Sequence, residues 1–216
     1  MDAQDLPAEI DCFFLTRTDR CERFLKVISY YGGCGEEGSA RCCSARIPVD
    51  VIALPADTDG VPDDFVIRPG YKTWTASLSA VCDACGKPFD ERASRDTHVR
   101  RIHSRSDGGP DTIISAAPPG AMWFADQMIL SSGWYRGPDG HCLVVKLPGG
   151  HQWCVDARAG NCDRRDDDVH RCWVRHGVPP AVTVDKNGDT CNAGAGSILV
   201  PGYHGHLIDG KLKRCG

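Results

Sequence analysis

Two cysteines and two histidines, at a spacing that suits one metal ion, are the feature that most limits how this chain can fold. Two residues separate Cys82 from Cys85, four separate His98 from His103, and twelve lie between the two pairs. Two thiolates on a tight turn and two imidazoles about one helical turn apart form a tetrahedral set of sulfur and nitrogen ligands, which zinc prefers. The sequence therefore predicts a Zn2+ site made of these four side chains.

The same segment resembles a C2H2-type zinc finger over about residues 80–105. The run Cys85-Gly86-Lys87-Pro88-Phe89 looks like the knuckle of that family. The resemblance implies a small ββα unit in which Phe89 packs behind the metal. Where the family usually has a large aliphatic residue, this chain has Arg95, so the folding of the unit would depend more on the metal.

Nucleic-acid binding is the role that this resemblance implies, because the finger helix of the family reads bases in the major groove. The reading positions fall on Glu91, Ser94 and Thr97, and none is an arginine that could bind guanine through two hydrogen bonds. Phosphate contact needs only positive charge, which five arginines on and after the expected helix would supply: Arg92, Arg95, Arg100, Arg101 and Arg105. We expect weak, non-specific contact with the backbone of DNA or RNA, and the plainer alternative is a solvated helix face of mixed charge.

Charge and cysteine content limit the other possibilities. The 216 residues include 13 cysteines and carry a formal net charge of -4, so bulk electrostatic attraction to nucleic acid or to a membrane is excluded. No secretory signal is visible from Met1 to Cys12, and no apolar run is long enough to cross a bilayer. The expected location is the cytoplasm, where cysteines serve as metal ligands or buried thiols rather than as disulfides.

Other cysteines leave alternative metal sites open. The thiols of Cys34, Cys42 and Cys43 could complete a zinc ribbon with the Cys82 and Cys85 pair, which would leave both histidines outside the site. Ligands that are close in sequence close a shorter loop, and this favours the finger set. Six side chains nearer the C-terminus could form a second metal site: Cys154, Cys162, His170, Cys172, His176 and Cys191.

An enzymatic interpretation uses the same C-terminal residues. Cys162 or Cys172 would be a nucleophile, a neighbouring histidine its base, and Asp156 or Asp168 would orient the imidazole. Such a site requires a cleft in which a thiol is within hydrogen-bond reach of a histidine with no metal between them. Buried cysteines and hydrogen-bonded histidines in a small β domain would explain most of the pattern without activity. No catalytic residue is therefore assigned, and an enzyme is the less expected class.

Turn signals set the expected organisation. Residues 1–78 form an N-terminal β segment, residues 79–106 the C2H2-type finger, and residues 107–120, with their Gly and Pro, a linker. Residues 121–216 form a β-hairpin domain that begins with a short helix over 121–131 and has turns of the hairpin type at Gly149-Gly150, Asn187-Gly188 and Asp209-Gly210. The expected fold class is α+β, mainly β and hairpin-rich, with one small ββα-like zinc finger.

Three stretches look like parts of uncharacterised proteins encoded by tailed bacteriophages: residues 12–20, 120–123 and 170–177. This resemblance implies a phage origin and the cytoplasm of the host cell, and it carries no activity. The leading hypothesis is a zinc-binding intracellular protein whose single finger contacts nucleic acid weakly. The alternatives are a zinc-stabilised structural or protein-interaction module without nucleic-acid binding, and a Cys/His enzyme in the C-terminal domain. Neither the partner nor the oligomeric state follows from the sequence.

Overall fold

Two compact units make up the chain. The computed structural model describes residues 7–29, 43–53, 64–67, 81–89, 93–129, 135–164, 166–167, 169–193 and 197–215. Unit 1 consists of Met1–Thr16 with Ser104–Gly216, and unit 2 consists of Arg17–His103. The first strand segment of the chain therefore belongs with its C-terminal half.

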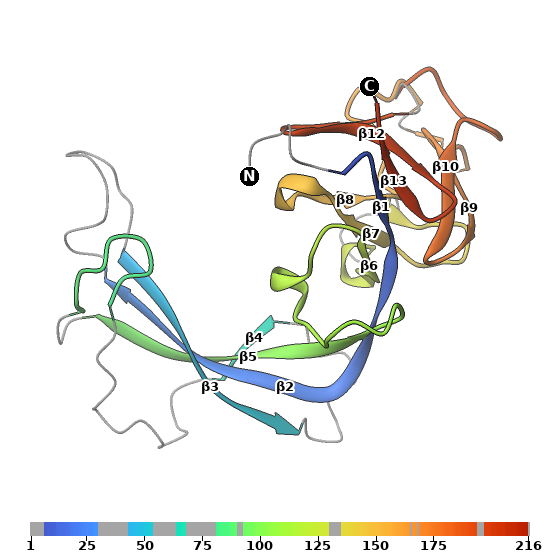
Figure 1. Cartoon of the computed structure of the whole chain (residues 1–216). Coiled ribbons are helices and arrows are strands. Elements are labelled where there is room, and N and C mark those ends of the chain that lie inside the picture. Colours follow the sequence, from blue (N-terminus) through green and yellow to red (C-terminus); the bar gives the residue numbers. More distant parts are fainter. Residues whose placement is uncertain are drawn as a thin grey trace. The chain divides into compact units, whose positions relative to one another are not determined.

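Both ends of the described chain join one sheet of unit 1. Its strands are β1 (Glu9–Asp11), β11 (Ile198–Val200), β12 (Tyr203–Ile208) and β13 (Lys211–Arg214), in the order β1-β13-β12-β11. Figure 1 shows β1, in blue, beside β13, in red. Asp209 and Gly210 join β12 to β13 with φ angles of 49° and 69°, the positive values that a two-residue hairpin turn requires, which confirms this predicted turn.

A second group of strands in unit 1 contributes side chains to the main apolar core, among them Met122, Leu143 and Val145. The strands are β6 (Ala121–Phe124), β7 (Leu143–Lys146) and β8 (Gln152–Cys154), and the first residues of β2 (Phe13–Ser29) pair in parallel with β6. All four side chains of β7 are buried: three are apolar, and the fourth, Lys146, donates from its Nζ to the backbone oxygen of Ser115 at 3.4 Å. The helix predicted over 121–131 is wrong, because β6 occupies its first half and η2 (Asp126–Met128) is a single 3-10 turn.

Two further strands of unit 1 form a two-stranded sheet of their own. β9 (Val174–Val178) pairs with β10 (Ala181–Asp185) across Pro179-Pro180, and Val182 and Val184 on β10 pack into the core that includes Leu143 and Leu207. The hairpin predicted at Asn187-Gly188 is wrong: the described residues after that turn do not pair with β10, and Thr190 instead bridges to Arg171. This departure carries Cys191 towards the loop that precedes β9.

The described part of unit 2 is an antiparallel sheet with an apolar cluster packed on it. Most of β2 pairs with β3 (Cys43–Ala53), and the strand order is β4 (Asp64–Ile67), β5 (Ser94–Arg105), β2, β3. The core comprises Leu25, Val27 and Ala93, with Ile47 and Phe89 packed against it. Other buried apolar side chains of this unit are Phe24, Ala45 and Val99.

The predicted finger helix is wrong, and with it the α+β fold class. Residues 94–105 form strand β5, and helix in the described part of the chain is confined to short 3-10 segments such as η1 (Ile114–Ala116), η2 and η4 (Pro148–Gly150). Val99 is fully buried on β5, between β4 and β2 in the sheet. Thr97, Val99 and Ile102 are β-branched, and such residues favour a strand once partner strands satisfy the backbone. The described fold is mainly β.

Candidate metal centre

Four potential metal ligands of unit 1 converge at one point. They come from the loop between β8 and β9 and from the chain after β10, and their ligand atoms all lie within 4.8 Å of one another. The four residues are Cys162, His170, Cys172 and Cys191, with relative exposures of 4%, 0%, 1% and 8%. A compact, buried group of three thiols and one imidazole could hold a metal ion.

The distances between the sulfurs match ligands around a common centre. Cys191 Sγ lies 3.9 Å from Cys162 Sγ and 3.7 Å from Cys172 Sγ. Two thiolates bound to one tetrahedral ion at about 2.3 Å are about 3.8 Å apart, whereas a disulfide joins its sulfurs at about 2.05 Å. The His170 Nε2 lies 3.2 Å from Cys162 Sγ and so faces the same centre.

Hydrogen bonds orient the histidine. The His170 Nδ1 lies 3.1 Å from the backbone oxygen of Asp167, which fits an Nδ1–H donor and leaves the lone pair of Nε2 for a metal. The Asp167 carboxylate accepts hydrogen bonds from the backbone N–H groups of Val169 and His170 and pairs with Arg164. These contacts, the backbone bonds first, lower the pKa of Asp167 to about 2. The Asp167 carboxylate therefore stays ionised at neutral pH and holds the backbone on which His170 lies.

A lysine ties the loops of the centre together. The Lys186 Nζ donates to the backbone oxygens of Cys191 at 2.7 Å and Ala193 at 2.8 Å, and also to that of Cys172. The backbone N–H of Ala159 donates to Cys172 Sγ at 3.2 Å. Three thiolates and a divalent ion would sum to one negative charge, which the nearby ammonium group balances.

The thiols differ in acidity. Burial raises the pKa of Cys172 to about 11. Burial also acts on Cys162, but hydrogen bonds from the backbone of Arg164 and from His170, Cys172 and Cys191 outweigh it and lower the pKa of Cys162 to about 7. A thiolate at Cys162 can thus form near neutral pH, as metal ligation requires.

No protein-family model, curated protein or solved structure matches the chain. The resemblances to C2H2-type fingers and to phage proteins stay predictions. In the described residues no helix is long and apolar enough to span a membrane.

The ligands predicted for the finger are separated in the structure. The ligand atoms of Cys82, Cys85 and Cys43 lie within 4.8 Å of one another, and all three belong to the five cysteines of the ribbon alternative. The His98 ring stacks on Phe24 at 5.2 Å, and His103 is buried with its Nδ1 3.2 Å from the backbone oxygen of Arg101. Among described residues, neither histidine joins a group of three or more potential ligands. Cys34 and Cys42 lie outside the described residues.

Three of the five arginines assigned to nucleic-acid contact are engaged within the protein. Arg100 is 8% exposed and stacks over the Phe24 ring at 4.3 Å. The Arg101 Nη1 donates to the Thr18 backbone oxygen at 3.0 Å, and Arg105 pairs with Asp107 at 2.6 Å and stacks over Phe13. Arg92 and the side chain of Arg95 lie outside what the structure describes. Because the predicted helix is a strand, no helix face presents these charges.

Of the six C-terminal candidates, two lie apart from the centre. The Cys154 Sγ is 3.2 Å from Cys142 Sγ, and His176 pairs with Asp185 at 2.9 Å. The proposed orienting carboxylate Asp156 is buried against Arg175, and Asp168 is outside the described residues. Sequence reasoning named all four converging residues but missed Asp167 and Lys186, whose roles depend on loop geometry rather than on spacing.

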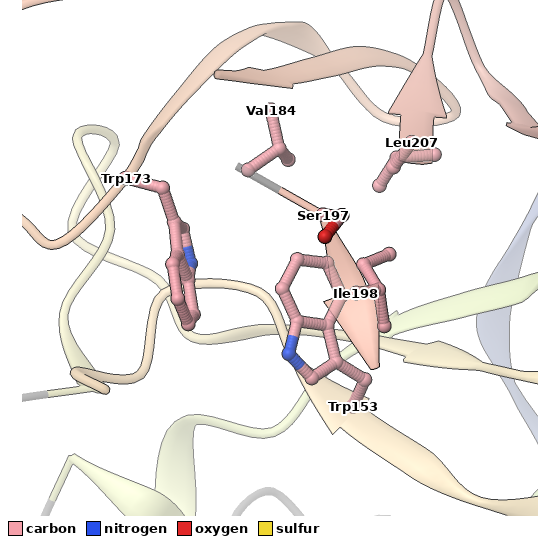
Figure 2. A pocket seen from close by; sticks show the side chains of 6 residues that line it. All are labelled: Trp153, Trp173, Val184, Ser197, Ile198 and Leu207. Atoms are coloured by element: carbon pink, nitrogen blue, oxygen red, sulfur yellow. The ribbon is translucent and has the colours of Figure 1, made fainter. Parts of the chain in front are cut away.

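A small pocket adjoins the centre through Trp173, the residue after Cys172. Figure 2 shows Trp153 and Trp173 facing it, with Val184, Ser197, Ile198 and Leu207 as the other lining residues. Its cavity volume of about 10 Å³ is near the least that holds one water molecule. This pocket is too small for an organic substrate.

Proposed function

We propose that unit 1 binds one zinc ion through Cys162, His170, Cys172 and Cys191, and that this ion is structural. The observation that carries the proposal is the convergence of four buried donors, with sulfur separations of 3.7 and 3.9 Å. Three thiolates with one imidazole are a common structural zinc set, and soft sulfur ligands disfavour magnesium and calcium.

A structural role fits better than catalysis because the protein supplies all four ligands. Catalytic zinc keeps an open position for water or substrate, whereas structural zinc is closed. The Cys162–His170 contact alone would suit a nucleophile and its base, but both side chains are buried and two more thiols lie beside them. A substrate would have no access to such a dyad.

The loops around the centre need a metal to hold them. The apolar cluster at this point contains Cys162, Cys172, Cys191 and Ala193, with only Ala159 and Trp173 packed against it. No large aliphatic side chain among the described residues joins that cluster. Structural zinc contributes an apparent binding free energy of about 10–16 kcal/mol in small zinc-binding peptides, enough to replace an absent apolar core.

The function supported best is therefore a zinc-stabilised structural or protein-interaction module. The internal contacts of Arg100, Arg101 and Arg105 favour this alternative over nucleic-acid contact. Binding to DNA or RNA stays a prediction, and its test is a titration at low salt, where phosphate contacts are strongest.

Zinc quantification on the purified protein tests the proposal. Cys172→Ser combined with Cys191→Ser should lose one equivalent relative to the wild type, and Cys12→Ser, a half-buried cysteine of unit 1 outside the centre, should lose none. His170→Cys keeps four zinc-binding donors and should retain the equivalent, whereas His170→Ala should lose it. Equal zinc in the double variant and the wild type would refute the proposal.

A further inference from the structure

A tight turn in unit 2 presents two thiols on the same side. Val81 bridges to Pro88, the Cys82 N–H donates to the Lys87 oxygen at 2.8 Å, and the Gly86 N–H donates to the Cys82 oxygen at 2.9 Å. Gly86 has a φ of 70°, which an L-residue with a side chain rarely adopts. The turn thus places Cys82 and Cys85 close together independently of any helix.

The start of β3 supplies a third thiol. Asp83 anchors the turn to this strand, because its N–H donates to the Ser44 oxygen at 3.0 Å and its Oδ2 accepts from the Arg46 N–H at 3.2 Å. The Cys43 Sγ is then 3.7 Å from Cys85 Sγ, again close to the edge of about 3.8 Å of a tetrahedron of sulfurs around one ion.

We infer that Cys43, Cys82 and Cys85 bind a second divalent, thiophilic ion, separate from the ion of unit 1. Three sulfur donors within 4.8 Å of one another select soft or borderline ions such as Zn2+ over Mg2+ or Ca2+. A fourth ligand is water or another donor group, since three are present among the described side chains.

This second ion would join the turn to the sheet. Phe89, at the end of the turn, packs against the core of Leu25 and Val27, and the three thiolates would fasten the same segment to β3. Since metal binding to a folded site contributes to folding free energy, the ion would add to the stability of unit 2. Cys43 and Cys82 are buried but Cys85 is exposed, so this ion is more accessible to a chelator than the buried ion of unit 1.

Reconstitution with Co2+ tests the inference, because thiolate-to-cobalt charge-transfer absorption reports the number of bound sulfurs. Wild-type protein should bind two equivalents, and Cys43→Ser with Cys82→Ser should bind one. The matched control is Cys21→Ala, a buried cysteine of unit 2 outside the group, which should bind two. In the Cys172→Ser, Cys191→Ser variant the remaining cobalt should show three or more thiolate ligands. A chelator should remove it faster than it removes the cobalt that the Cys43→Ser, Cys82→Ser variant retains.

Two results would overturn the inference. One is equal cobalt binding by the Cys43→Ser, Cys82→Ser variant and the wild type. The other is fewer than three thiolates on the ion that the Cys172→Ser, Cys191→Ser variant retains. If wild-type protein binds one equivalent, and the Cys172→Ser, Cys191→Ser variant binds as much, the ion of unit 1 is absent. That result would count against the structural zinc proposal and not against this inference, so the two failures are distinguishable.

Discussion

The ammonium group of Lys186 donates a hydrogen bond of 2.7 Å to the backbone oxygen of Cys191. It also holds the backbone of Cys172 and Ala193, so one side chain joins the two loops that carry the metal ligands. Replacing a group that orients a metal ligand typically lowers the affinity for the metal by about 10- to 100-fold.

Lys186→Met should therefore weaken zinc binding by about 10- to 100-fold, because both the loop contacts and the balancing charge are lost. Competition with a chromophoric chelator measures the affinity. Lys213→Met is the control, because the Lys213 ammonium pairs with Glu9 at the surface at 3.7 Å, and its loss should leave the affinity unchanged. An equal affinity in Lys186→Met and the wild type would show that the lysine is dispensable.

Metal removal should loosen the region around Trp173. Its indole Nε1 donates to the Val155 oxygen at 2.6 Å, and the residue follows the ligand Cys172 directly. Chelation should shift the fluorescence of Trp173 to longer wavelength as its surroundings become wetter, and added zinc should reverse the shift. Trp173→Phe should abolish most of the change. A chelator-induced shift of equal size in the Cys172→Ser, Cys191→Ser variant would contradict this assignment.

The sequence predicts that Cys82 and Cys85 lie together, but it does not predict which side chains join them. Cys82 and Cys85 do lie together on a tight turn, but the helix that would bring His98 to them is a strand. The spacing of two histidines fits a helix face, yet it says nothing of the strands β2 and β4 that pair with this segment. Tertiary pairing thus outweighed a local motif.

For the centre in unit 1, the sequence names the candidate residues but does not show which of them converge. All four of its residues could be named from the sequence, but their irregular spacing gave no way to exclude Cys154 or His176. The structure separates them because Cys154 is on β8, beside Cys142, whereas the chain after β10 returns to Arg171. Convergence of loops from distant parts of a sequence cannot be predicted from ligand spacing alone.

A buried ion pair in unit 1 should be costly to break. Arg175 is 4% exposed and pairs with Asp156, which also accepts the Leu143 N–H at 2.7 Å. Asp156→Ala should reduce the free energy of unfolding by about 3–5 kcal/mol, because a buried guanidinium loses its buried partner. Asp139 is the partner of Arg175 at the protein surface, and Asp139→Ala should reduce the free energy of unfolding by only about 1 kcal/mol. Urea unfolding measures both, and equal losses would contradict the ranking.

Acid should remove the contribution of Asp139. Burial opposes ionisation of this carboxyl, but hydrogen bonds from Arg175 at 2.8 and 3.1 Å and from the His141 N–H outweigh it and hold the pKa of Asp139 below its usual value. A carboxyl whose pKa is lowered by folding stabilises the protein above its unfolded-state pKa of about 3.9, and this stabilisation is lost as the pH falls through the native pKa.

The difference in unfolding free energy between the wild type and Asp139→Asn should accordingly be constant above about pH 5 and shrink below about pH 4. Urea unfolding of both proteins over this pH range measures it. Zinc release at low pH affects both proteins alike, since thiolates must be protonated in each, so the difference isolates Asp139. A difference that grows as the pH falls would mean that the carboxyl is stabilised in its protonated form and that its pairing with Arg175 does not outweigh burial.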